Sequence, residues 1–172
     1  TAGDGVKTVY VQFMDGAEHT PGDVCSGNIS VSNATVNIND TIGFDVTKPN
    51  TTHAAPTTWQ KDDVDVVLTI QDPTVNSVSS GVNLTEYCID QVAVGATPAV
   101  DCVPNLTLTG NTITLDQTLA GFAHEYFVRY ASTDNAGNLQ DTVTEHIKID
   151  KILPTTSDDT IGGWLSGSLT VG

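Results

Sequence analysis

Aspartates at predicted strand ends and turns are the residues of this chain best suited to bind a cation. They are Asp62, Asp63, Asp72, Asp134, Asp141 and Asp150. Loops cluster at the ends of a β-sandwich, and Ca2+ takes six to eight oxygen ligands, which such clusters can supply. If Ca2+ binds, we expect it at Asp150 with the linker around Pro154, or at the turn containing Asp134, Asn135 and Asn138. The alternative is that these residues only form turns and acidic surface, because the sequence has no D-x-D-x-D-G run.

Three cysteines make an odd count. Cys88 and Cys102 lie 14 residues apart, in two extended segments joined by a loop that contains Gly and Pro. This arrangement predicts a disulfide, and closing so short a loop contributes roughly 3 kcal/mol in the chain-entropy model. Cys25 is then left either as a free thiol or as a cross-link to another chain or to a missing segment of this one.

Several classes of function are disfavoured by the sequence. We find no nucleophile motif, no phosphate-binding loop and no histidines at metal-ligand spacing, so we expect no enzyme. The formal net charge is −15 with only six Lys or Arg residues, which disfavours nucleic acid and anionic membranes as partners. No apolar run approaches the roughly 20 residues that span a bilayer, so we expect no membrane insertion.

The composition indicates an extracellular or cell-surface protein. Thr, Val and Asn are frequent, and N-x-Ser/Thr sequons are more numerous than chance predicts. The sequon asparagines are Asn28, Asn33, Asn39, Asn50, Asn83 and Asn105. Glycosylation of at least one of them would explain the excess, and so would simple Thr/Asn richness.

The predicted secondary structure is entirely β. Alternating or apolar stretches are bounded by Gly, Pro, Asn and Asp, and no amphipathic helical stretch of usable length occurs. The predicted strands span 63–72, 83–90, 106–115, 124–132 and 142–150. Short strands at this spacing predict an all-β sandwich.

Self-comparison reveals a repeat. At an offset of 105, without gaps, residues 44–59 align with residues 149–164. The identical pairs are Asp45 with Asp150, Pro49 with Pro154, Thr51 with Thr156 and Trp59 with Trp164. Upstream, "VYVQFMDGAEH" aligns with "VRYASTDNAGN" once the first copy has a longer following loop at about 20–41. The chain therefore carries two copies of one closing motif.

The strand–DNAGN–strand–"IDKILPTT" series, followed by Trp and an alternating strand, resembles the Big-type immunoglobulin-like repeats of bacterial and archaeal surface adhesins. In those repeats the turn joins the last two strands, and the Asp-to-Pro tail closes one module before the next begins. The opening motif appears here between Trp59 and Gln91. The resemblance implies a seven-stranded immunoglobulin-like sandwich that serves as a spacer, stalk or adhesive module.

Aligning this module with the chain predicts three parts. Residues 51–155 form one complete immunoglobulin-like β-sandwich. Residues 1–50 supply the closing strands of a preceding module, and residues 156–172 supply the opening strand of a following one. A partial sandwich exposes an apolar face and unpaired strand edges, so both partial modules need completion.

Two sources of completion are open. A donor strand containing Trp164, Leu165, Leu169 and Val171 would complete the N-terminal strands of a neighbouring copy, head to tail, with the loop 20–41 adding strands. Alternatively, the chain is a segment of a longer repeat protein, and adjacent repeats of that chain complete both ends.

Two functions follow from these readings. The first is a structural subunit of an extracellular filament, stalk or surface layer. The second is an adhesin or carbohydrate-binding module of a long surface protein. Trp59 and Trp164 could stack on sugars, but their equivalence in the repeat favours a packing role.

Overall fold

The computed structural model describes residues 3–13, 24–25, 29–30, 36–116 and 123–157, and it describes the side chains of residues 3–9, 40–116 and 123–157. Every regular element in these ranges is a β-strand. The strands are β1 (Gly5–Phe13), β2 (Val24–Cys25), β3 (Ile29–Ser30), β4 (Val36–Phe44), β5 (Thr52–Ala54), β6 (Val64–Thr69), β7 (Val82–Ala93), β8 (Leu106–Thr107), β9 (Thr112–Leu115), β10 (His124–Asp134) and β11 (Val143–Ile149). The all-β prediction is confirmed.

Two antiparallel sheets pack face to face and enclose the core. One has the strand order β11-β10-β7-β8 and the other β5-β6-β9. In β6 the alternation of the sequence becomes alternating burial, with Val64, Val66 and Leu68 inside. They meet inward side chains of the larger sheet, including Val128 and Ile147, which are fully buried. Each such side chain stabilises the fold by about 1.5–3 kcal/mol through its burial. We call β5–β11 the sandwich.

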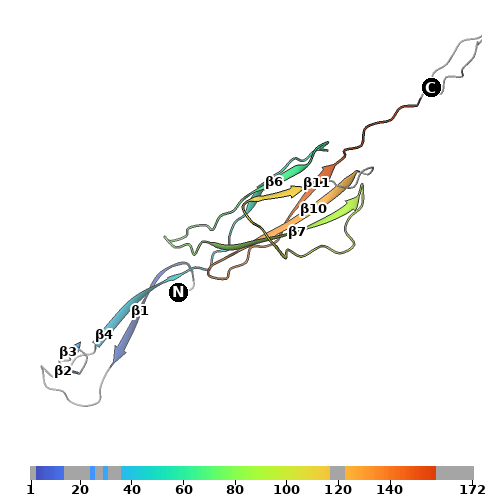
Figure 1. The fold of residues 1–172 in the computed structure, drawn as a ribbon. Helices are drawn as coiled ribbons and strands as arrows, with labels where there is room; N and C mark the ends of the chain where they lie inside the picture. Colours follow the sequence, from blue (N-terminus) through green and yellow to red (C-terminus); the bar gives the residue numbers. More distant parts are fainter. Residues whose placement is uncertain (1–2, 14–23, 26–28, 31–35, 117–122, 158–172) are drawn as a thin grey trace, which may run out of the picture.

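A separate two-stranded ribbon extends from one end of the sandwich. It consists of β1 paired antiparallel with β4, and we call it the N-terminal hairpin. Figure 1 shows it at the opposite end of the sandwich from residues 151–157, where the chain leaves β11. The chain therefore runs through the sandwich from end to end.

The stretch 106–115 differs from its expected single strand. It forms β8, which pairs with β7, and β9, which pairs with β6, so it crosses from one sheet to the other. Gly110 lies at the crossing with a φ of +84°, a left-handed conformation that glycine adopts without steric cost. The apolar alternation changes phase at this corner, from Leu106 and Leu108 before Gly110 to Ile113 and Leu115 after it. Each half alternates by itself, which is why the stretch reads as one strand.

Candidate functional site

Three carboxylates meet at the end of the sandwich that bears the N-terminal hairpin. Asp45 follows β4, Asp72 follows β6, and Asp134 ends β10. One carboxylate oxygen from each lies within 4.8 Å of the others. Ligand oxygens around one Ca2+ lie at most about 5 Å apart, since each is 2.3–2.6 Å from the ion. The spacing therefore fits three ligands of a single divalent cation.

Hydrogen bonds from nearby turns orient these carboxylates. Asp72 Oδ2 accepts bonds from Ser79 Oγ at 2.8 Å and from the Gly81 N–H at 2.7 Å. Asp134 is 1% exposed, and its two oxygens accept bonds from the backbone N–H and the side-chain amide of Asn138, both at 2.8 Å. These donors fix the orientation of both side chains, but they leave part of the acceptor capacity of the oxygens unused.

One oxygen in the cluster lacks any partner. Asp72 Oδ1 is buried, and no hydrogen-bond donor of the described residues contacts it. A buried acceptor without a partner costs free energy, and more so when it is charged. A cation bound between the three carboxylates would compensate this oxygen and the repulsion between like charges. The donor set therefore fits a hard cation that prefers oxygen.

The charged state of Asp45 is favoured by its surroundings. The side chain of Ser80 lowers the pKa of Asp45, with further contributions from the N–H groups of Ser80 and Thr47 and from the side chain of Asp4. Burial acts in the opposite direction and is outweighed. Asp45 is thus available as an anionic ligand at neutral pH.

The residues predicted for Ca2+ lie at both ends of the sandwich. Asp134 belongs to the cluster, and Asn138 donates to Asp134 and, at 3.1 Å, to the backbone oxygen of Asp45. Asn135 donates to the backbone oxygens of Ser80 and Gly81. Asp150 lies after β11, where its carboxylate accepts the N–H of Ile152.

Asp45 was not among the predicted ligands, although the repeat contained a signal for it. The offset of 105 makes Asp45 the equivalent of Asp150. Asp150 would therefore take the place of Asp45 in an equivalent cluster, if another module followed. Asp72 was recognised only as one strand-end carboxylate among several, because nothing local links it to Asp134.

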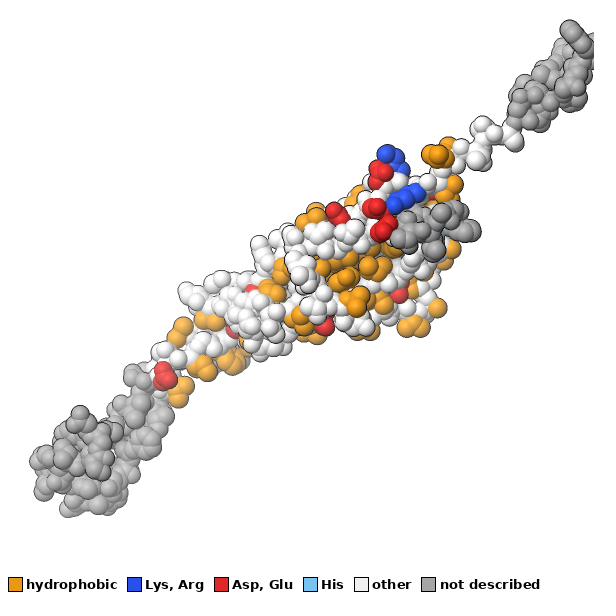
Figure 2. All heavy atoms as spheres, viewed as in Figure 1, with side chains coloured by type: hydrophobic (Ala, Val, Ile, Leu, Met, Phe, Trp, Pro, Cys, Tyr) orange, Lys and Arg blue, Asp and Glu red, His pale blue; other side chains and the backbone are white. Residues whose placement is uncertain are grey.

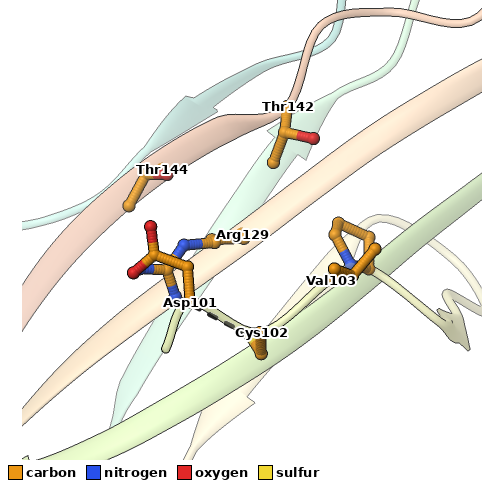
Figure 3. A pocket seen from close by; sticks show the side chains of 7 residues that line it. Asp101, Cys102, Val103, Arg129, Thr142 and Thr144 are labelled. Atoms are coloured by element: carbon orange, nitrogen blue, oxygen red, sulfur yellow. Dashed lines mark hydrogen bonds and ion pairs between the residues drawn. The ribbon is translucent and has the colours of Figure 1, made fainter. Parts of the chain in front are cut away.

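The predicted disulfide between Cys88 and Cys102 is confirmed. It ties β7 to the segment before β8, beside a shallow hollow of about 270 Å³ whose lining includes Asp101, Arg129 and Thr144 (Figure 3). Arg129 is 6% exposed and pairs with both Asp90 and Asp101. Its charge is already neutralised there, so the hollow does not provide an unpaired cation for an anionic ligand. We interpret this group as a clamp on the disulfide loop.

Trp59 lies near the opposite end of the sandwich from the carboxylate cluster. It is 45% exposed, and Lys148 Nζ lies 5.9 Å from the centre of its ring. The adjacent residue, Gln60, pairs with Ile149 in a parallel bridge. Because Lys148 covers part of the ring and the backbone is paired beside it, the contacts support the expected packing role.

Polar groups connect the two sheets through the buried side chain of Tyr130. Its hydroxyl lies 2.7 Å from His53 Nδ1, and the other ring nitrogen of His53 lies 2.8 Å from Glu145. Burial and, secondarily, the charge of Glu145 raise the pKa of Tyr130 to about 12. Between pH 10 and this value an unfolded chain releases a proton that the folded protein keeps, so stability falls as the pH rises.

We predict that Tyr130→Phe removes this alkaline sensitivity. At pH 11 the raised pKa of Tyr130 is expected to cost about 1.4 kcal/mol of unfolding free energy relative to pH 8. Urea unfolding of both proteins at the two pH values measures the difference, with Cys25→Ser in each to prevent thiol exchange. Equal losses in both proteins would contradict the assignment.

The remaining predicted residues are placed only in part. Asn50, Asn83 and Asn105 are exposed. Asn39 and Cys25 lie in β4 and β2, but their side chains are outside the described part of the chain. The other predicted residues also lie outside the described residues: Asn28, Asn33, Trp164, Leu165, Leu169 and Val171.

Comparisons with known proteins leave the family open. No protein-family model, no curated protein and no solved structure matches this chain. In the described residues, no helix is long and apolar enough to cross a membrane.

Proposed function

We propose that this chain is a structural unit of an extracellular filament, stalk or surface layer, built from immunoglobulin-like β-sandwich modules joined end to end. A sheet of four strands opposite a sheet of three is the arrangement that such modules have. The disulfide supports an oxidising compartment outside the cytosol. The observation that carries the proposal is the pairing register of the N-terminal hairpin.

The N-terminal hairpin has the register of a module's closing hairpin. Gly5 pairs with Phe44 in the N-terminal hairpin, and His124 pairs with Ile149 between β10 and β11 of the sandwich. These pairs correspond if β1 is offset by 119 residues and β4 by 105. The same two offsets relate "VYVQFMDGAEH" to "VRYASTDNAGN" and residues 44–59 to residues 149–164 in the sequence. The offsets found in the sequence repeat are therefore the same as the offsets that relate the paired residues of the two hairpins.

Exposure along the hairpin supports the same interpretation. Under these offsets Val9 and Ile42 correspond to Val128 and Ile147, which are fully buried in the sandwich. Val9 and Ile42 are 50% and 56% exposed. The hairpin therefore has the inward face of a module without the opposite sheet. Figure 2 shows apolar side chains gathered where the hairpin meets the sandwich.

The segment after each closing hairpin also differs in exposure between the two copies of the repeat. Pro49 and Thr51 are buried where the N-terminal hairpin joins the sandwich, whereas their equivalents Pro154 and Thr156 are exposed. A following module would cover the second pair as the sandwich covers the first. We further propose that Ca2+ at Asp45, Asp72 and Asp134 fixes each linker to the module that follows it.

A chimera tests this proposal. Residues 51–123 placed directly before residues 5–157 would give the hairpin its missing strands in one chain, because His124 corresponds to Gly5. We expect amide hydrogens of β1 and β4 to exchange far more slowly in the chimera than in residues 1–157 alone. Val64→Asp with Val66→Asp in the added copy only is the matched control and is expected to abolish that protection. Fast exchange in both chimera and parent would contradict the proposal.

A further inference from the structure

We infer that the exposed face of the N-terminal hairpin is a docking surface for residues 164–171 of a second copy of this chain. The inference rests on the proposed function and names the partner. The docking surface consists of Val9, Ile42 and Phe44. Their equivalents in the sandwich are Val128, Ile147 and Ile149, and all three are 0% exposed.

The hairpin needs a partner of this kind. Val9, Ile42 and Phe44 are 50%, 56% and 43% exposed, and an isolated two-stranded ribbon is marginally stable in water. Contiguous apolar surface on one face of an unpaired ribbon favours association with a further strand or sheet. Lys7 and Asp40 lie on the same face, because they pair with Ile42 and Val9. Their charges are opposite and residues 164–171 contain no charged residue, so charge repulsion does not oppose docking.

The sandwich indicates which segment covers that face. Val128, Ile147 and Ile149 share one core with Val64 and Val66 of β6. The offset of 105 places Leu169 and Val171 at the positions of Val64 and Val66. Residues 164–171 therefore carry the apolar alternation that covers this face inside the sandwich.

The sandwich also supplies the register. Gln60 pairs in parallel with Ile149, and its N–H donates to the backbone oxygen of Lys148 at 2.9 Å. The N–H of Asp150 donates in turn to the backbone oxygen of Gln60 at 2.8 Å. Under the same offset Leu165 takes the place of Gln60, and Phe44 takes the place of Ile149. We therefore expect Leu165 of one copy to pair in parallel with Phe44 of the next.

Chain length favours a second copy over the same chain. Residues 158–172 extend at most about 54 Å. They follow a chain that leaves the sandwich at the end opposite the hairpin (Figure 1). The 12 residues of β7 alone span about 40 Å along that axis. Returning across the sandwich would leave too little chain to lie along the hairpin, whereas a neighbour placed head to tail presents the segment directly.

The test is self-association of the full 172-residue chain, measured by sedimentation velocity and electron microscopy over a wide range of concentrations. We expect concentration-dependent head-to-tail oligomers. Leu169→Asp is expected to weaken association about a hundred-fold or more, because it places a charge against the apolar docking surface. Thr170→Asp is the matched control, since its equivalent Asp65 faces outward in β6, and it should associate like the parent.

Cysteine pairs test the register. In a Cys25→Ser background, a Phe44→Cys chain mixed with a Leu165→Cys chain should form covalent dimers on mild oxidation. A Ser168→Cys chain mixed with the same Phe44→Cys partner should not, because it lies about 10 Å further along the strand. Equal cross-linking by both pairs would overturn the register.

The two proposals fail in different ways. If the 172-residue chain stays monomeric at every concentration while the chimera protects its hairpin, docking by a second copy is overturned and the modular function stands. A chimera that leaves the hairpin unprotected overturns the modular function itself. In the chimera extended to residue 172, the docking surface is already covered, so we expect no chain growth.

Discussion

Removing the Cys88–Cys102 disulfide is expected to lower the free energy of unfolding by about 3 kcal/mol. The bond closes a loop of 14 residues, and a loop of this size contributes roughly that amount by restricting the unfolded chain. The folded chain should keep its form after reduction, because Asp90 also accepts the N–H of Cys102 at 3.0 Å and pairs with Arg129. Denaturant unfolding with and without reductant measures the change.

The comparison requires a background in which only this disulfide responds. Cys25→Ser removes the third thiol. The double variant Cys88→Ser/Cys102→Ser should have the same free energy of unfolding as the reduced parent, and reductant should not change that value. The m-value is expected to rise when the bond is broken, since the unfolded chain then exposes more surface. A loss below about 0.5 kcal/mol would show that the Arg129 clamp alone holds the loop, contrary to the loop-closure account.

Calcium is expected to raise the stability of the protein by about 2.7 kcal/mol when it is present at a hundred times its dissociation constant. The expected ligands are Asp45, Asp72 and Asp134, whose carboxylates lie within 4.8 Å of one another. Without the ion, three negative charges repel one another and Asp72 Oδ1 remains buried without a partner. Thermal unfolding in calcium and in chelator measures the difference.

The effect of Asp72→Asn on stability is expected to have opposite signs with and without calcium. The amide has the shape of the carboxylate, removes one charge, and can donate a hydrogen bond from the position of the unpaired oxygen. The variant should therefore be more stable than the parent in chelator and less stable in calcium. Asp62→Asn changes the charge equally at an exposed site and should respond to calcium like the parent. Parallel shifts in all three proteins would exclude this site.

Local patterns in the sequence predicted a large share of the fold. The alternation in 63–72 and the apolar stretches in 124–132 and 142–150 correspond to β6, β10 and β11, because burial of one sheet face imposes a period of two. Cys88 and Cys102 were paired correctly, since the short loop between them leaves few alternatives. The repeat offset predicted which residues of two hairpins correspond, before any pairing was known.

Contacts between distant segments could not be predicted in this way. Asp45, Asp72 and Asp134 come from three separate strand ends, and no local pattern sets their mutual distance. The burial of Arg129 could not be predicted either, because a charged residue in an alternating strand is expected to face solvent. Its burial depends on Asp90 and Asp101, which a disulfide loop brings over the outer face of the sheet.

The parallel bridge between Gln60 and Ile149 has a consequence for how the sandwich is expected to respond to tension. The chain enters at one end of the sandwich and leaves at the other, so a pull on its two ends would draw the segment around Gln60 and β11 in opposite directions. The two hydrogen bonds of this bridge then carry the load together, instead of opening one after the other. With the disulfide holding the loop between Cys88 and Cys102 closed, that loop adds no length when the rest of the sandwich unfolds. A row of such modules would behave as a stiff tether with a limited reach.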